Sequence, residues 1–258
     1  MKGDDVLNIL DAPVGVLSFN QALERALEYA LDHERTKYVV AINPEKVMAA
    51  RKDSVVAEFL RRADLRVADG IGVVAAARIL YGAKLERVPG VELMEAICRE
   101  SGRRGVKIFL YGAKEEVNAE AAEKLKERYP DIVIAGRQNG YLPEDQFDEL
   151  VARVNASGAD ALFLALGSPR QEKWMIRYGE ALNVGLCMGV GGSLDAITGK
   201  VKRAPLAWRR LNLEWFYRLL HQPSRIGRQL NIFVFGFKVV LLKLADVLHI
   251  RRSHKISA

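Results

Sequence analysis

The sequence has few of the residues that build disulfide frameworks and metal centres. Only two cysteines occur, Cys98 and Cys187, and the four histidines are scattered or terminal. The patterns H-E-x-x-H, C-x-x-C, G-x-S-x-G and Walker A are absent, as is an Asp-x-Asp of the kind that holds a divalent metal. These absences argue against a disulfide-stapled domain, a zinc protease, a P-loop protein and a serine hydrolase. The low cysteine content also indicates a reducing compartment.

The sequence also lacks a long uninterrupted apolar run. No signal-peptide stretch follows the acidic N-terminus, so we expect a cytoplasmic protein. The apolar segment from Leu230 to Leu248 is interrupted by Lys238, Lys243 and Asp246. At about 100° per residue these three residues share one side of a helix. The segment therefore predicts an amphipathic helix lying in a membrane interface rather than crossing it, with packing on the core or on a second subunit as the alternative.

Positive charge is concentrated near the C-terminus. The chain has 258 residues and a net charge of +7. Residues 199–258 contain 13 Lys or Arg against Glu214 and Asp246, a balance of +11 that leaves −4 for the first 198 residues. Basic tails of this kind bind phosphate on nucleic acid, on anionic lipid or on a diphosphate substrate.

Short apolar runs alternate with helical patterns along the first 198 residues. The runs expected to be strands are 6–10, 14–17, 38–42, 65–67, 106–111, 132–135, 161–166 and 186–190. Continuous apolar strands separated by helices predict an α/β fold, here a Rossmann-like, mainly parallel sheet with helices on both faces. Residues 1–198 would form this core, and residues 199–258 a basic, largely helical C-terminal appendage.

Polar residues follow two of these runs. Asn43-Pro44-Glu45 comes after the run ending at Ile42, and Asp69-Gly70 follows Ala68. The carboxyl ends of parallel strands are where ligands usually bind in such sheets. Asp69 could act as a general base toward a hydroxyl nucleophile, or it could simply cap the helix that follows. The residues alone leave both interpretations open.

Three glycine-rich turns have structural and ligand-binding interpretations. Gly70 to Ala75 matches the dinucleotide pattern G-x-G-x-x-G/A with Glu92 about 20 residues on, although a tight turn that aims Asp69 explains it at least as well. Gly167-Ser168-Pro169-Arg170-Gln171 and Gly189-Val190-Gly191-Gly192-Ser193 each follow an apolar run. Such turns expose N–H groups that can hold an anion, and Asp195 could accept hydrogen bonds from a base or a ribose.

Five segments together resemble the WecG/TagA/CpsF glycosyltransferases. They are Asn43-Pro44-Glu45, Ala68-Asp69-Gly70-Ile71-Gly72, Gly167 to Lys173, Gly189 to Ser193 and Gly199 to Pro205, in the family's order and spacing. The similarity covers about residues 8–228, and the combination is far more specific than any single motif.

This resemblance implies a metal-independent, inverting hexosyltransferase with no cofactor. The TagA-like branch moves N-acetylmannosamine from UDP-N-acetylmannosamine to a polyprenyl-diphosphate-linked N-acetylglucosamine, in the linkage unit of wall teichoic acid. The expected partners are therefore a UDP-sugar, the lipid-linked acceptor and the anionic inner face of the cell membrane, where the protein would be peripheral. No nucleic acid is expected, and a homo-oligomer is an open alternative.

The resemblance also implies roles for individual residues. Asp69 matches the general base and Asn43 the amide on the donor side, while Gln171, Arg170, Gly191 and Gly192 map to the substrate pocket. Asp195 lies where the uracil end would be held. The tail arginines that would neutralise the diphosphate leaving group are Arg218, Arg225 and Arg228.

Two departures from the pattern of the TagA-like branch affect the expected identity of the donor sugar rather than the expected reaction. Ala41 stands where threonine is common, and Glu92 stands where aspartate is more usual. A transferase for the uronic acid of N-acetylmannosamine or for another UDP-hexose is therefore the main alternative. An NAD-linked oxidoreductase built on Gly70 and Gly72, and a non-catalytic membrane or nucleic-acid adaptor using the basic tail, are the remaining ones.

Overall fold

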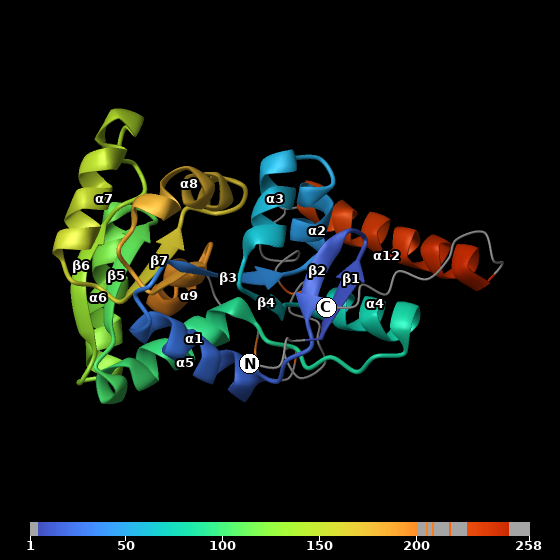
Figure 1. The fold of residues 1–258 in the computed structure, drawn as a ribbon, viewed down its shortest axis with the longest axis horizontal. Coiled ribbons are helices and arrows are strands. Elements are labelled where there is room, and N and C mark those ends of the chain that lie inside the picture. Colours follow the sequence, from blue (N-terminus) through green and yellow to red (C-terminus); the bar gives the residue numbers. More distant parts are fainter. Residues whose placement is uncertain (1–4, 201–204, 206–207, 209–216, 218–225, 248–258) are drawn as a thin grey trace.

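A six-stranded parallel sheet forms the centre of the computed structural model, which describes residues 5–200, 205, 208, 217 and 226–247. The strand order is β4-β3-β8-β7-β5-β6, and every neighbouring pair is parallel. The strands of this sheet are β3 (Lys37–Ile42), β4 (Leu65–Ala68), β5 (Lys107–Gly112), β6 (Val133–Gln138), β7 (Ala161–Ala165) and β8 (Leu186–Gly189). This architecture confirms the expected Rossmann-like α/β fold (Figure 1).

Helices cover both faces of the sheet. One face packs against α2 (Pro44–Ala50), α3 (Ser54–Arg62), α4 (Ile71–Tyr81), α7 (Phe147–Ala156) and α8 (Arg170–Tyr178). The other face packs against α1 (Phe19–Leu31), α5 (Gly90–Arg104), α6 (Glu115–Arg128) and α9 (Ser193–Thr198). Short 3-10 turns, η1 (Glu144–Gln146) and η2 (Gly179–Ala181), precede α7 and follow α8. The inner strands read as largely apolar runs because both of their sides are buried, whereas every residue of the edge strand β6 is exposed or partly exposed.

The first two apolar runs lie outside the main sheet. β1 (Val6–Ile9) and β2 (Ala12–Gly15) form a separate antiparallel hairpin beside β4 and α4. The turn residues Leu10 and Asp11 have φ angles of 51° and 71°, which side chains other than glycine rarely adopt. A two-residue turn between right-twisted strands requires this conformation.

The C-terminal helix α12 (Ile226–Val247) packs across α2 and α4 (Figure 1). Phe235 and Val239 are buried in this contact, and the ammonium group of Lys243 donates to the carbonyl of Leu80 at 3.2 Å. Leu80 lies in the last turn of α4, where carbonyls lack partners within the helix and a cation is favourable. The segment is thus helical as expected, and it is anchored on the protein along one side. None of the helices in the described residues is long and apolar enough to cross a bilayer.

Both cysteines are buried and unbridged. Cys98 lies in α5, and Cys187 lies in β8, within the run 186–190 that the sequence predicts to be a strand. Burial raises the pKa of each thiol, so neither side chain is a ready thiolate nucleophile.

Candidate functional site

The predicted site residues lie at the carboxyl ends of four adjacent strands. Asn43 follows β3, Asp69 follows β4, Gln171 belongs to the helix after β7, and Gly191 follows β8. The helix after β3 packs on one face of the sheet and the helix after β8 on the other. The tips of β3 and β8 therefore form a topological switch point, which is where open α/β sheets bind ligands.

Asn43 and Asp69 are held next to each other. The backbone N–H of Asp69 donates to the carbonyl of Ile42 at 2.8 Å, so the tips of β4 and β3 are joined directly. A Cβ atom placed on Gly70 would lie 3.9 Å from the Cβ of Asn43. The amide and the carboxylate that the sequence assigned to one site are thus neighbours.

Asp69 lies just before the helix α4 and beside the start of α5. The residue at the N-cap of α4 is Gly70, with φ of 88°, which has no side chain to cap the helix. Asp69 is partly exposed, and its Oδ2 lies 3.9 Å from the position of a Cβ on Gly90, the first residue of α5. The positive end of a helix dipole stabilises a negative charge placed there. Gly70, and not Asp69, thus occupies the N-cap position of α4.

Asn43 has a structural role as well. It is the N-cap of α2, and its Oδ1 accepts the backbone N–H of Lys46 at 2.9 Å. The cap fixes the side-chain orientation and leaves the Nδ2 group as the part of Asn43 that can donate to a ligand.

A buried polar network connects the turns behind the strand tips. Gln171 is 3% exposed; its Oε1 accepts the N–H of Gly191 at 3.1 Å, and its Nε2 donates to Glu172 at 3.2 Å. Glu172 is fully buried and forms an ion pair with Lys46 of α2. The network thus runs from the cap of α2 through Lys46, Glu172 and Gln171 to the glycine turn after β8. In this geometry Gln171 positions the backbone of that turn.

The charge state of Glu172 follows from its partner. Burial by itself would raise the carboxyl pKa, but the adjacent ammonium group of Lys46 outweighs it and the pKa lies below the ordinary value. The sequence analysis did not single out Lys46 or Glu172 as site residues. A lysine three positions after Asn43, on a helix whose neighbouring residues Val47 and Met48 are apolar, was the available signal.

Two glycines near the strand tips lie where a larger side chain would not fit. A Cβ on Gly189 would lie 2.4 Å from Nε2 of Gln171, so any larger residue would displace that amide. A Cβ on Gly72 would lie 2.6 Å from the ring of Pro44. The second glycine of the dinucleotide-like pattern is therefore needed for packing of α4 against α2. This supports the tight-turn interpretation over a phosphate-binding one.

The remaining predicted residues occupy different positions. Arg170 is exposed, and its Nη2 donates to the carbonyl of Gly140 at 3.3 Å. Gly192 is exposed in the turn after β8, and a Cβ there would lie 3.9 Å from Oδ2 of Asp195. Arg218 and Arg225 lie outside the described residues, as does the side chain of Arg228 in α12. That these arginines neutralise the diphosphate leaving group stays a prediction.

The departures from the branch pattern lie close to Asp69. A Cβ on Gly90 would lie 2.9 Å from the Cβ of Ala41, so these two residues are in close contact beside the candidate base. Glu92 lies in the first turn of α5. Ala41 thus lies near Asp69, and Glu92 lies in a helix whose first residue is next to Asp69.

The fold is that of a Rossmann-like protein, with an amide and a carboxylate at the sheet edge where such proteins usually bind ligands. A family model described as "Glycosyl transferase WecG/TagA/CpsF family" matches residues 7–247. The chain belongs to this family, and its class of activity is glycosyl transfer.

Proposed function

We propose that this protein transfers N-acetylmannosamine from UDP-N-acetylmannosamine to a polyprenyl-diphosphate-linked N-acetylglucosamine, as in the linkage unit of wall teichoic acid. The observation that carries the proposal is the juxtaposition of Asn43 and Asp69 at the switch point of a chain of this family. The reaction would take place at the inner face of the cell membrane, with the protein bound peripherally.

In the proposed reaction Asp69 is the general base. Its carboxylate accepts the proton of the acceptor hydroxyl while that oxygen forms a bond to the anomeric carbon of the donor. The bond from this carbon to the UDP oxygen breaks on the opposite side, UDP leaves with the electron pair, and the anomeric configuration inverts. Asn43 orients the donor through its Nδ2 group, Asp195 binds the nucleoside, and Arg218, Arg225 and Arg228 offset the charge of departing UDP.

The first experiment tests the base. Asp69→Asn keeps the size of the side chain but removes the proton acceptor, so turnover should fall about 10²-fold or more while UDP binding and folding stay nearly unchanged. Asp145→Asn, the same change at an exposed residue of η1, is the control and should keep wild-type turnover. Turnover of Asp69→Asn within a few-fold of the control would refute the assigned role.

The second experiment identifies the substrates. Purified protein is incubated with a synthetic prenyl-diphosphate N-acetylglucosamine and, separately, with UDP-N-acetylmannosamine, its uronic acid and other UDP-hexoses, and products are scored by mass. The proposal predicts one added N-acetylhexosamine from the first donor. Transfer only of the uronic acid would favour the main alternative, a transferase for another surface polysaccharide.

A further inference from the structure

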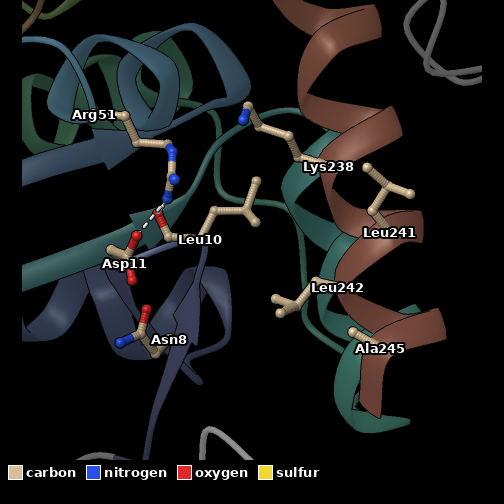
Figure 2. A pocket seen from close by; sticks show the side chains of 8 residues that line it. All are labelled: Asn8, Leu10, Asp11, Arg51, Lys238, Leu241, Leu242 and Ala245. Carbon is tan, nitrogen blue, oxygen red and sulfur yellow. Dashed lines mark hydrogen bonds and ion pairs between the residues drawn. The ribbon is translucent and has the colours of Figure 1, made fainter. Parts of the chain in front are cut away.

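A pocket of about 300 Å³ lies between the β1–β2 hairpin and α12, away from the strand tips (Figure 2). The hairpin contributes Asn8, Leu10 and Asp11, and the C-terminal end of α2 contributes Arg51. Lys238 and Leu242 line the opposite wall from α12. None of the roles proposed above involves this pocket.

The charges lining the pocket are suited to a monoanion. Arg51 pairs with the carboxylate of Asp11 and donates to the carbonyl of Leu10 at 3.4 Å. Lys238 extends from α12 toward the same space, and its ammonium group makes no ion pair with another described residue (Figure 2). Two cations and one carboxylate leave a formal charge of +1, which a phosphodiester would balance.

The orientation of α12 is the reverse of that expected for a helix on a water-exposed surface. Its polar residues lie on the side that faces the protein, together with the buried Phe235 and Val239: Lys243 binds a carbonyl of α4, and Oδ1 of Asp246 is buried. Its outer side carries a row of exposed apolar residues: Phe233, Val234, Phe237, Val240, Leu241 and Leu244. Phe233 and Phe237 are 62% and 64% exposed. A contiguous apolar row of this size indicates a surface that is covered by an apolar medium or partner.

The pocket and the apolar row meet at Leu241, which belongs to both. A molecule that occupies them together must have an anionic head next to an apolar chain. We propose that the pocket binds the phosphate of an anionic phospholipid while the apolar row of α12 enters the acyl region of the bilayer. Lys238 is the main cation for the phosphate, because Asp11 already neutralises Arg51. This proposal rests on the peripheral membrane location proposed above but not on the identity of the sugar.

The test measures binding of the full-length protein to vesicles by sedimentation. Vesicles of phosphatidylcholine with phosphatidylglycerol are compared with vesicles of phosphatidylcholine alone. Lys238→Gln should weaken binding to the anionic vesicles about fivefold, the effect of losing roughly 1 kcal/mol per basic residue at such a surface. Lys126→Gln makes the same change in α6, on the other face of the sheet, and should bind like wild type.

A second variant keeps the test decisive if Lys238→Gln folds poorly. Asp11→Asn removes the carboxylate that competes with the phosphate for Arg51, so binding to anionic vesicles should rise above wild type by a similar factor. Asp145→Asn is its matched control. Equal binding by Lys238→Gln and Lys126→Gln, or no gain for Asp11→Asn over Asp145→Asn, would overturn the proposal.

Two further measurements separate the occupant from the alternatives. In light scattering without lipid, we expect no dimer that forms through the apolar row. A dimer that the substitution Phe237→Ser dissociates would assign the row to a second copy of the chain and overturn the proposal. Transfer to a water-soluble acceptor analogue in detergent should be the same for wild type and Lys238→Gln. A protein that binds lipid as predicted but transfers no sugar would contradict the proposed function alone.

Discussion

The two ends of α2 each carry an ion pair, and the pairs differ in burial. Near its start Lys46 pairs with Glu172, and both side chains are at least nine-tenths buried. At its end Arg51 pairs with Asp11, whose side chain is 77% exposed. A buried pair cannot exchange its partners for water and therefore fixes geometry, whereas an exposed pair can exchange and remains available to a ligand. The first suits the site behind the strand tips, and the second suits a surface pocket.

The largest expected difference comes from breaking the buried pair. Lys46→Met leaves the Glu172 carboxylate buried without its cation, which should lower the free energy of unfolding by about 3–5 kcal/mol in urea denaturation. The double variant Lys46→Met/Glu172→Leu removes both charges and should recover most of that loss. A loss below about 1 kcal/mol for the single variant would contradict the distinction drawn between the two ends of α2.

The pH dependence of stability tests the buried ion pair in a second way. Because the folded-state pKa of Glu172 lies below its ordinary value of 4.5, its contribution is fully present above that pH. The contribution is lost as the pH falls through the lowered folded-state value. Urea midpoints between pH 7 and pH 3 should therefore fall more steeply for wild type than for Lys46→Met/Glu172→Leu. Parallel curves would show that folding does not lower the pKa of Glu172.

The smallest effect is expected at the exposed pair. Arg51→Gln should change the free energy of unfolding by no more than about 1 kcal/mol, since solvent screens the interaction with Asp11. The same urea measurement checks it, with Lys126→Gln as a second exposed-pair variant for comparison. A loss as large as that of Lys46→Met would mean that the hairpin depends on this pair for its position.

The sequence predicted the fold well because the hydrophobic patterns that indicate strands and helices are local. Runs such as Ala161–Leu166 are apolar on both sides only when a strand is covered on both faces, and the alternation with helices gives a parallel sheet. The first two runs looked similar but form a hairpin outside the sheet, since strand partners depend on long-range packing.

The candidate site was predictable only in part, for the same reason. Asn43 and Asp69 could be predicted because each follows an apolar run, and their strands are neighbours in the sheet. Lys46 and Glu172 are separated by 126 positions, and nothing in the local pattern of either predicts that they meet. Similarly, Gly72 matches a nucleotide-binding pattern, and only the ring of Pro44 beside it reveals the need for a small residue.

The length of α2 also limits the distance between Asn43 and the pocket beside Arg51. Its seven residues span about 10 Å at 1.5 Å per residue, with the donor-side amide Asn43 before its first residue and Arg51 after its last. A lipid phosphate held in the pocket by Lys238, beside Arg51, would therefore keep Asn43 within a height of roughly one length of α2 from the phosphates. A sugar attached directly to a membrane-embedded diphosphate could reach that height without leaving the bilayer.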